Sequence, residues 1–147
     1  MEKQKISKSL VLSGLLLIFF GLILGAFISE FKNPRMALST HLTALQHGGL
    51  LILLGVINKE LLLKKIPLLC SKVLNIYSAL SISFALFLAA LWGTSSQTPI
   101  AGAGFKGSKM HEGIVNFFLN TGSVAVFIAM ILVILGFIKR LRVTSES

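Results

Sequence analysis

Two histidines lie in a stretch of the sequence that is turning from polar to apolar, and they are the residues best suited to carry chemistry. The stretch is NPRMALSTHLTALQHGGLLILLG, residues 33–55, and it contains His41 and His47. Ionisable groups are costly inside a membrane, so a membrane segment that keeps them usually uses them. A neutral imidazole binds metals, and it can also donate or accept a proton near neutral pH.

The spacing of the two histidines argues against a metal ion shared between them. They are six residues apart, and this places them roughly 120° apart around a helix. The HExxH zinc motif is absent, and Cys70 is the single cysteine, so there is neither a cysteine-rich metal site nor a disulfide framework. A site shared by His41 and His111 has no support from spacing. The simplest alternative is that His41 hydrogen-bonds a lipid headgroup or a backbone carbonyl.

Glycines near His41 favour a flat cofactor. Gly48 is seven residues after His41 and therefore lies within about 20° of the same helix face. Gly48 and Gly49 would leave a smooth surface below the imidazole, which suits a macrocycle held by one axial nitrogen, such as haem. The alternative is that these glycines serve only helix packing, as Gly21 and Gly25 in the preceding apolar segment are expected to do. Geometry alone leaves both interpretations open.

Motifs for other reaction classes are absent from the sequence. There is no nucleophile elbow, catalytic triad, phosphate-binding loop or pair of carboxylates. The acidic residues are widely separated: Glu2, Glu30, Glu60, Glu112 and Glu146. Hydrolysis and phosphoryl transfer are therefore disfavoured.

Four apolar segments must position these side chains. Of the 147 residues, 54% are hydrophobic and only 13% are charged, too few charges for the surface of a soluble domain. Residues 9–28, 40–58, 72–92 and 113–138 are each close to the ~20 residues that cross a bilayer as a helix. We predict an all-α fold, a four-helix membrane bundle that forms one domain over residues 1–147. The first segment is too long for a secretory signal and lacks a cleavage pattern, so we expect a retained anchor.

The net charge of +9 is explained by topology and does not indicate a nucleic-acid partner. Basic residues concentrate before the first segment, between the second and third, and after the fourth. Four crossings place these three regions on one side, which the positive-inside rule makes cytoplasmic. We therefore predict an integral protein of the bacterial inner membrane with both termini in the cytoplasm. Its basic face would contact anionic lipid.

Polar side chains recur on one face of the third and fourth segments. In the third they are Ser71, Asn75, Ser78 and Ser81, and in the fourth they are Glu112, Asn116, Asn120 and Ser123. Residues three or four apart are neighbours on a helix surface. These stripes predict a polar pocket inside the bundle or between subunits, which opens towards one side of the membrane.

The connections carry local signals as well. Pro34 disfavours helix just before it, so that Ser39 or Thr40 is expected to cap the second helix. Residues 61–72 alternate leucine clusters with lysines and are predicted to lie along the membrane interface. Residues 93–113 are rich in Gly, Ser and Thr, and we expect them to form a flexible or folded cap on the outer side.

The stretch NPRMALSTHLTALQHGGLLILLG resembles the corresponding segment of hydroxylaminobenzene mutases, small four-span membrane proteins related to styrene oxide isomerase. LAALWGTSSQTPIAGAG (residues 88–104) and HEGIVNFFLNTG (residues 111–122) extend the resemblance over most of the chain. It implies an isomerase that rearranges a small aromatic substrate. The substrate would be hydroxylaminobenzene, giving 2-aminophenol, or an aryl epoxide, giving an aldehyde.

The resemblance also implies a cofactor and an assembly. In styrene oxide isomerase a haem b lies between the subunits of a homotrimer, and one axial histidine near the start of the second span binds its iron. His41 matches that ligand. The ferric haem would act as a Lewis acid on the substrate, and Gly48 would line the cofactor.

Two departures from the isomerase put its substrate in doubt. His47 stands where the isomerase has an asparagine near the substrate, and a histidine can shuttle a proton whereas an amide cannot. The substrate-placing tyrosine has no clear match, since Tyr77 is the only tyrosine and Ser83 lies nearer that position. We expect His47, Asn75 and Asn116 to orient the substrate.

Two other functions stay open on the sequence. The protein would be a haem carrier, electron-transfer subunit or sensor if His111 supplied a second axial ligand. It would be an assembly protein if the polar stripes served only helix association.

Overall fold

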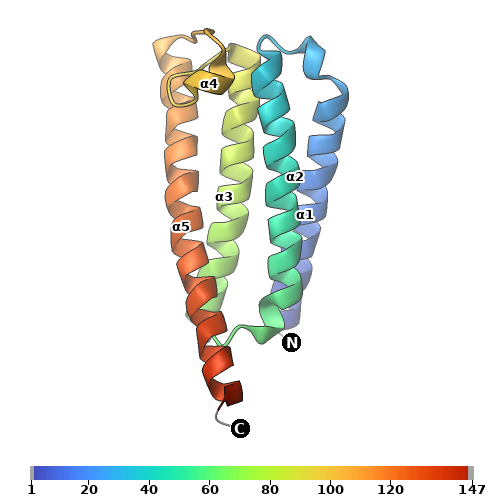
Figure 1. Cartoon of the computed structure of the whole chain (residues 1–147), viewed down its shortest axis with the longest axis vertical. Coiled ribbons are helices and arrows are strands. Elements are labelled where there is room, and N and C mark those ends of the chain that lie inside the picture. Colours follow the sequence, from blue (N-terminus) through green and yellow to red (C-terminus); the bar gives the residue numbers. More distant parts are fainter. Residues whose placement is uncertain (1, 146–147) are drawn as a thin grey trace.

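Four long helices form the body of the protein. The computed structural model describes residues 2–145. The long helices are α1 (Glu2–Ala26), α2 (Pro34–Ile57), α3 (Lys65–Trp92) and α5 (Lys109–Ser145). The connections hold three short elements, η1 (Ile28–Glu30), η2 (Asn58–Glu60) and α4 (Pro99–Gly102). Both ends of the described chain lie at one end of the molecule, the terminal end, and α4 lies at the opposite end, the loop end (Figure 1).

All four long helices have the length and composition of membrane spans. The candidate spans are Lys3–Ala26, Pro34–Glu60, Lys65–Trp92 and Lys109–Val143, and each contains nearly all of one predicted segment. Large apolar side chains point outwards, as Phe19 and Phe127 do with exposed fractions of 62% and 70%. Such a surface suits lipid rather than water. The prediction of an all-helical membrane protein is confirmed.

The helices pack in chain order. α1 packs against α2, α2 against α3, and α3 against α5, whereas α5 makes no comparable contact with α1 or α2 over the described residues. Figure 1 shows α2 and α3 between the two outer helices. The apolar core consists of two clusters. One contains Leu10, Leu61 and Leu68 near the terminal end, and the other contains Met36 and Ala89 near the loop end.

Glycines let α1 and α2 approach each other closely. A Cβ atom at Gly14 would lie 2.5 Å from the Gly48 carbonyl oxygen, and one at Gly48 would lie 2.7 Å from the Gly14 carbonyl oxygen. A Cβ atom at Gly21 would lie 3.0 Å from the Ala44 Cβ. The expectation that Gly21 allows close packing is thus confirmed. Helix association in lipid depends on such contacts, because apolar burial gives little driving force there.

The start of α2 differs from the prediction. Asn33 is the N-cap, its side-chain oxygen accepts a hydrogen bond from the Met36 N–H at 3.1 Å, and Pro34 occupies the first turn, where its missing N–H does no harm. The expectation that Ser39 or Thr40 caps this helix is wrong. Both lie inside α2 and donate to the carbonyls four residues earlier.

The second connection also differs from the prediction. Leu61–Lys64 is extended, and α3 begins at Lys65, so Pro67 lies in the first turn of that helix. Residues 61–72 therefore form no separate surface segment, because their second half continues directly into α3.

The long connection before α5 is a folded cap. The Glu112 carboxylate accepts hydrogen bonds from the backbone N–H groups of Ser95, Ser96 and Gly107, at 3.0, 3.0 and 3.1 Å. One side chain in the first turn of α5 thus satisfies three donors of the loop. Of the two forms that the sequence left open, the structure has the folded one.

Replacing Gly48 by alanine should destabilise the protein, because the new methyl group would meet backbone and side-chain atoms of α1. Overpacking of this kind costs about 1–3 kcal/mol. Gly49 is the matched control, since a Cβ there meets nothing within 4 Å. Thermal unfolding in detergent, followed by circular dichroism, should show a lower Tm for Gly48→Ala than for Gly49→Ala. Equal values would contradict this account of the α1–α2 contact.

Replacing Glu112 by alanine should open the cap, because three backbone donors would lose their acceptor. Limited proteolysis should then cut residues 93–108 faster, by about tenfold if the loop opens locally. Glu30→Ala is a control, since over residues 2–145 the Glu30 carboxylate accepts a hydrogen bond only from the Ser29 hydroxyl. Unchanged cleavage in Glu112→Ala would show that the loop is held by other contacts.

Candidate functional site

His41 lies between α1 and α2 with a defined hydrogen bond. Its Nδ1 is 2.7 Å from the Gly21 carbonyl oxygen. A carbonyl can only accept, so Nδ1 carries the proton and donates, and Nε2 keeps its lone pair. Nε2 makes no hydrogen bond to the residues that the structure describes. The imidazole packs on Gly25, where a Cβ atom would lie 2.6 Å from Nδ1.

This arrangement fits an axial ligand of a haem. A metal-binding histidine almost always donates its second N–H to a carbonyl or carboxylate, and this bond sets the tautomer and orients the ring. Within residues 2–145 no three His, Cys, Asp or Glu side chains are grouped so that they could hold a metal ion. A metal at His41 would therefore bring most of its ligands with it, as the iron of a porphyrin does.

The glycines after His41 lie on different surfaces. Gly48 is buried, and α1 fills the space beside it, since a Cβ there would lie 2.6 Å from the Ile18 side chain. Gly49 is exposed and has open space around it. The expected floor at Gly48 is thus occupied by a neighbouring helix, and the open surface lies instead at Gly49, roughly 80° from His41 around α2.

His47 faces the other neighbour of α2. Its ring lies against the backbone of Ala79 on α3, whereas the His41 ring meets α1. The two side chains therefore diverge, as their spacing predicted. His47 is half-buried, and its Nδ1 atom is buried without a hydrogen-bond partner.

Asn75 lies on α3, near the residue whose backbone meets His47. It lies one helical turn before Ala79 and is 4% exposed. Its amide nitrogen donates to the Ser71 carbonyl at 2.9 Å, while its side-chain oxygen is buried without a partner. Asn75 is therefore one turn away from the backbone that meets His47, whereas His41 faces α1.

Asn116 is part of the cap at the loop end. Its side-chain oxygen accepts a hydrogen bond from the Ser96 hydroxyl at 3.0 Å, and Asn120 accepts one from Gln97 in the same way. Asn116 lies on α5, which does not pack against α2. Within one chain it is therefore not brought together with the histidines. The stripe on α5 anchors the loop.

His111 also lies away from His41. Its ring stacks on Trp92, with centroids 4.1 Å apart and planes inclined by 15°. This pair joins α3 to the start of α5. Within one chain, His41 and His111 belong to helices that do not pack together.

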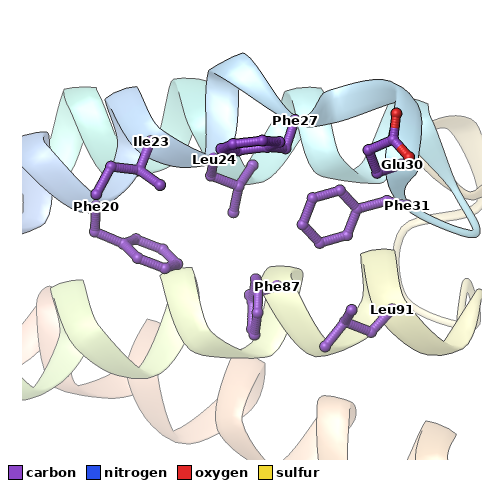
Figure 2. Close-up of a pocket in the computed structure, with 8 residues that line it drawn as sticks. All are labelled: Phe20, Ile23, Leu24, Phe27, Glu30, Phe31, Phe87 and Leu91. Carbon is purple, nitrogen blue, oxygen red and sulfur yellow. The ribbon is translucent and has the colours of Figure 1, made fainter.

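An aromatic cavity between α1 and α3 was not predicted from the sequence (Figure 2). Its volume is about 420 Å³, and its lining residues are Phe20, Ile23, Leu24, Phe27, Glu30, Phe31, Phe87 and Leu91. Phe87 meets Phe20 and Phe31 edge-on, at centroid distances of 5.7 and 5.9 Å. Its lining residues are almost all apolar, so they form no polar pattern that distinguishes them from other membrane-span residues. The two helices that form its walls are also far apart in the sequence. The cavity suits a small planar apolar molecule.

The cavity and His41 lie on two sides of the same stretch of α1. Phe20 and Leu24 line the cavity, whereas Gly21 and Gly25, the next residue in each case, meet α2 and His41. One helix therefore separates the aromatic cavity from the imidazole.

Comparison with known proteins assigns this architecture to a family. The model of the styrene oxide isomerase family matches residues 6–138. The chain is 34% identical to hydroxylaminobenzene mutase HabA of Ectopseudomonas oleovorans over 128 residues, 86% of this chain and 95% of that relative. It is 28% identical to HabB of the same organism over 132 residues, 89% of this chain and 80% of HabB. No solved structure gave a significant match. Since the family match spans all four membrane helices, this chain belongs to the styrene oxide isomerase family and is an isomerase.

Proposed function

We propose that this protein is a haem b-dependent membrane mutase that converts hydroxylaminobenzene to 2-aminophenol. The observation that carries the proposal is the hydrogen bond from His41 Nδ1 to the Gly21 carbonyl. It leaves Nε2 as the free lone pair that iron ligation requires. Two relatives that align over most of the chain are named hydroxylaminobenzene mutases, which supports this substrate.

The bound cofactor would supply Lewis acidity, by which ferric iron polarises the N–O bond of a hydroxylamine. The protein supplies the rest. Gly21 holds the imidazole in one tautomer, and Gly25 leaves room for its ring. Water is largely excluded, because the surrounding helices present apolar side chains. No co-substrate is consumed, in agreement with the absence of a nucleotide-binding motif.

The rearrangement requires a proton to move. The N–O bond and one ortho C–H bond break, and a ring C–O bond and an N–H bond form. A group must therefore accept the ring proton and return a proton to nitrogen. His47 is our candidate, because an imidazole can both accept and donate a proton, and its Nδ1 has no partner among the described residues. Asn75, near the residue whose backbone meets His47, would help to orient it or the substrate, and Asn116 is the weakest candidate because of its position in the cap.

The aromatic cavity supports an aromatic substrate taken from the bilayer. Ile23 on α1 and Phe27, the residue that follows α1, line the cavity and are 47% and 56% exposed. An arylhydroxylamine dissolved in lipid would therefore reach the cavity without crossing a polar surface.

The proposal includes an assembly and an orientation. We propose a homotrimer in the bacterial inner membrane, with the cofactor held between subunits and both termini in the cytoplasm. The open surface at Gly49 and the α5 face that meets neither α1 nor α2 offer room for neighbouring subunits. Basic residues at the terminal end, such as Lys59 and Lys139, support the orientation.

A second candidate reaction is the rearrangement of an aryl epoxide to an aldehyde, which the match to the styrene oxide isomerase family favours. In that reaction a hydride migrates within the substrate, so no proton acceptor is needed.

A third candidate, a non-catalytic haem protein with two axial histidines, is less favoured, because His111 stacks on Trp92.

Removing the proposed ligand should remove the cofactor. His41→Ala should lower haem affinity by at least about 100-fold, since even loss of an outer-shell partner costs 10–100-fold. The Soret band of the purified protein should disappear, and so should 2-aminophenol formation. His111→Ala is the control and should keep both. A His41→Ala protein that folds and retains its Soret band would refute the assignment of the ligand.

Replacing His47 by asparagine should separate the two reactions. The amide cannot carry a proton, so turnover of hydroxylaminobenzene should fall by about 10²- to 10⁴-fold, the usual contribution of a general acid–base group. Haem content should not change, because His47 faces α3 whereas His41 faces α1. Product analysis by chromatography with both substrates is the measurement. Full mutase activity in His47→Asn would exclude a proton-transfer role for this residue.

A further inference from the structure

Three polar atoms of α2 and α3 are buried without a hydrogen-bond partner among the residues that the structure describes. They are His47 Nδ1, Asn75 Oδ1 and Ser78 Oγ. Asn75 and Ser78 are only 4% and 1% exposed. A buried polar group without a partner is costly, and the cost is greatest in a membrane, where no surrounding solvent can satisfy it. Three such atoms on two helices that pack together therefore call for a further partner.

The three side chains belong to, or lie against, one short stretch of α3. Asn75 and Ser78 are three residues apart and thus share a helix face. Ala79, whose backbone meets the His47 ring, completes the same turn. Residues 75–79 extend only about 6 Å along the helix axis. This short span is compatible with one small molecule that hydrogen-bonds all three groups.

The hydrogen-bonding capacities of the three groups match those of water. The His47 ring meets the backbone of Ala79, and in the tautomer that carries its proton on Nε2, Nδ1 is an acceptor. The Asn75 amide nitrogen donates to Ser71, which leaves its oxygen as a second acceptor. The Ser78 hydroxyl can donate. One molecule with two donors and an acceptor satisfies the set.

We propose that an ordered water molecule is bound between α2 and α3, donating to His47 Nδ1 and Asn75 Oδ1 and accepting from Ser78 Oγ. Buried waters typically make about three hydrogen bonds to such groups. The site does not depend on the proposed function. It would give His47 an exchangeable neighbour inside the membrane, which a proton-transferring histidine needs.

The sign of a stability change tests the proposal. If the water is bound, Ser78→Ala removes one of its hydrogen-bond partners and leaves the other buried polar atoms less well satisfied. The Tm should then fall by about 3 °C, which corresponds to a loss of roughly 1 kcal/mol in the free energy of unfolding. Asn75→Leu should behave alike. Ser83→Ala is the matched control: its hydroxyl is also buried without a partner, but it faces an apolar cavity with Leu16, Phe20 and Phe84 among the lining residues. Its Tm should stay constant or rise.

A Tm that stays constant or rises in Ser78→Ala and Asn75→Leu, as in the control, would overturn the proposal, because truly isolated polar groups are better replaced by apolar ones.

A second measurement covers variants that fail to fold. Water-edited NMR of the ¹⁵N-histidine-labelled wild-type protein should transfer magnetisation from water to the His47 ring, and this transfer should be lost in Ser78→Ala. No transfer in the wild type would equally overturn the proposal, whatever the activity of the enzyme.

Discussion

The close approach of α1 and α2 is the contact on which the candidate site depends. Gly14 and Gly48 bring the two backbones together, and this approach places the Gly21 carbonyl within 2.7 Å of His41 Nδ1. A bulkier residue at the crossing would separate the helices and remove the acceptor that sets the histidine tautomer. In lipid, where apolar burial contributes little between helices, packing of small residues supplies the association. Packing and ligand chemistry are thus coupled through one helix pair.

The sequence predicted the helices well because the constraint on them is local. A bilayer demands about 20 apolar residues per span, and each predicted segment falls almost wholly within one long helix. Helix ends were harder to predict. Hydropathy marks where a span enters lipid. The helix α2 begins earlier, at the Asn33 cap, because the start of a helix is set by a partner for its first N–H groups and does not require apolar surroundings.

The sequence predicted the directions in which the site side chains face, but not the residues that they contact. The spacing of His41 and His47 predicted that the two rings diverge, and they do. The same angular argument placed Gly48 below His41, but it could not show that α1 occupies that surface. Asn116 and Glu112 were expected beside a pocket, yet the N–H groups of the preceding loop require acceptors, and Glu112 satisfies three of them. Partners of this kind depend on tertiary contacts that periodicity does not contain.

The divergence of the histidines constrains how the proposed mutase can work. His41 meets α1, His47 meets α3, and they are separated by about 9 Å along α2 as well as by the helix itself. A substrate held at an iron on His41 would lie beyond the ring, farther still from His47 of the same chain. If both residues act on one substrate, the second must therefore come from a neighbouring subunit or act through bound water. Both routes agree with a site completed between subunits, and the bare surface at Gly49 is where such a neighbour could approach without clashing with a side chain of α2.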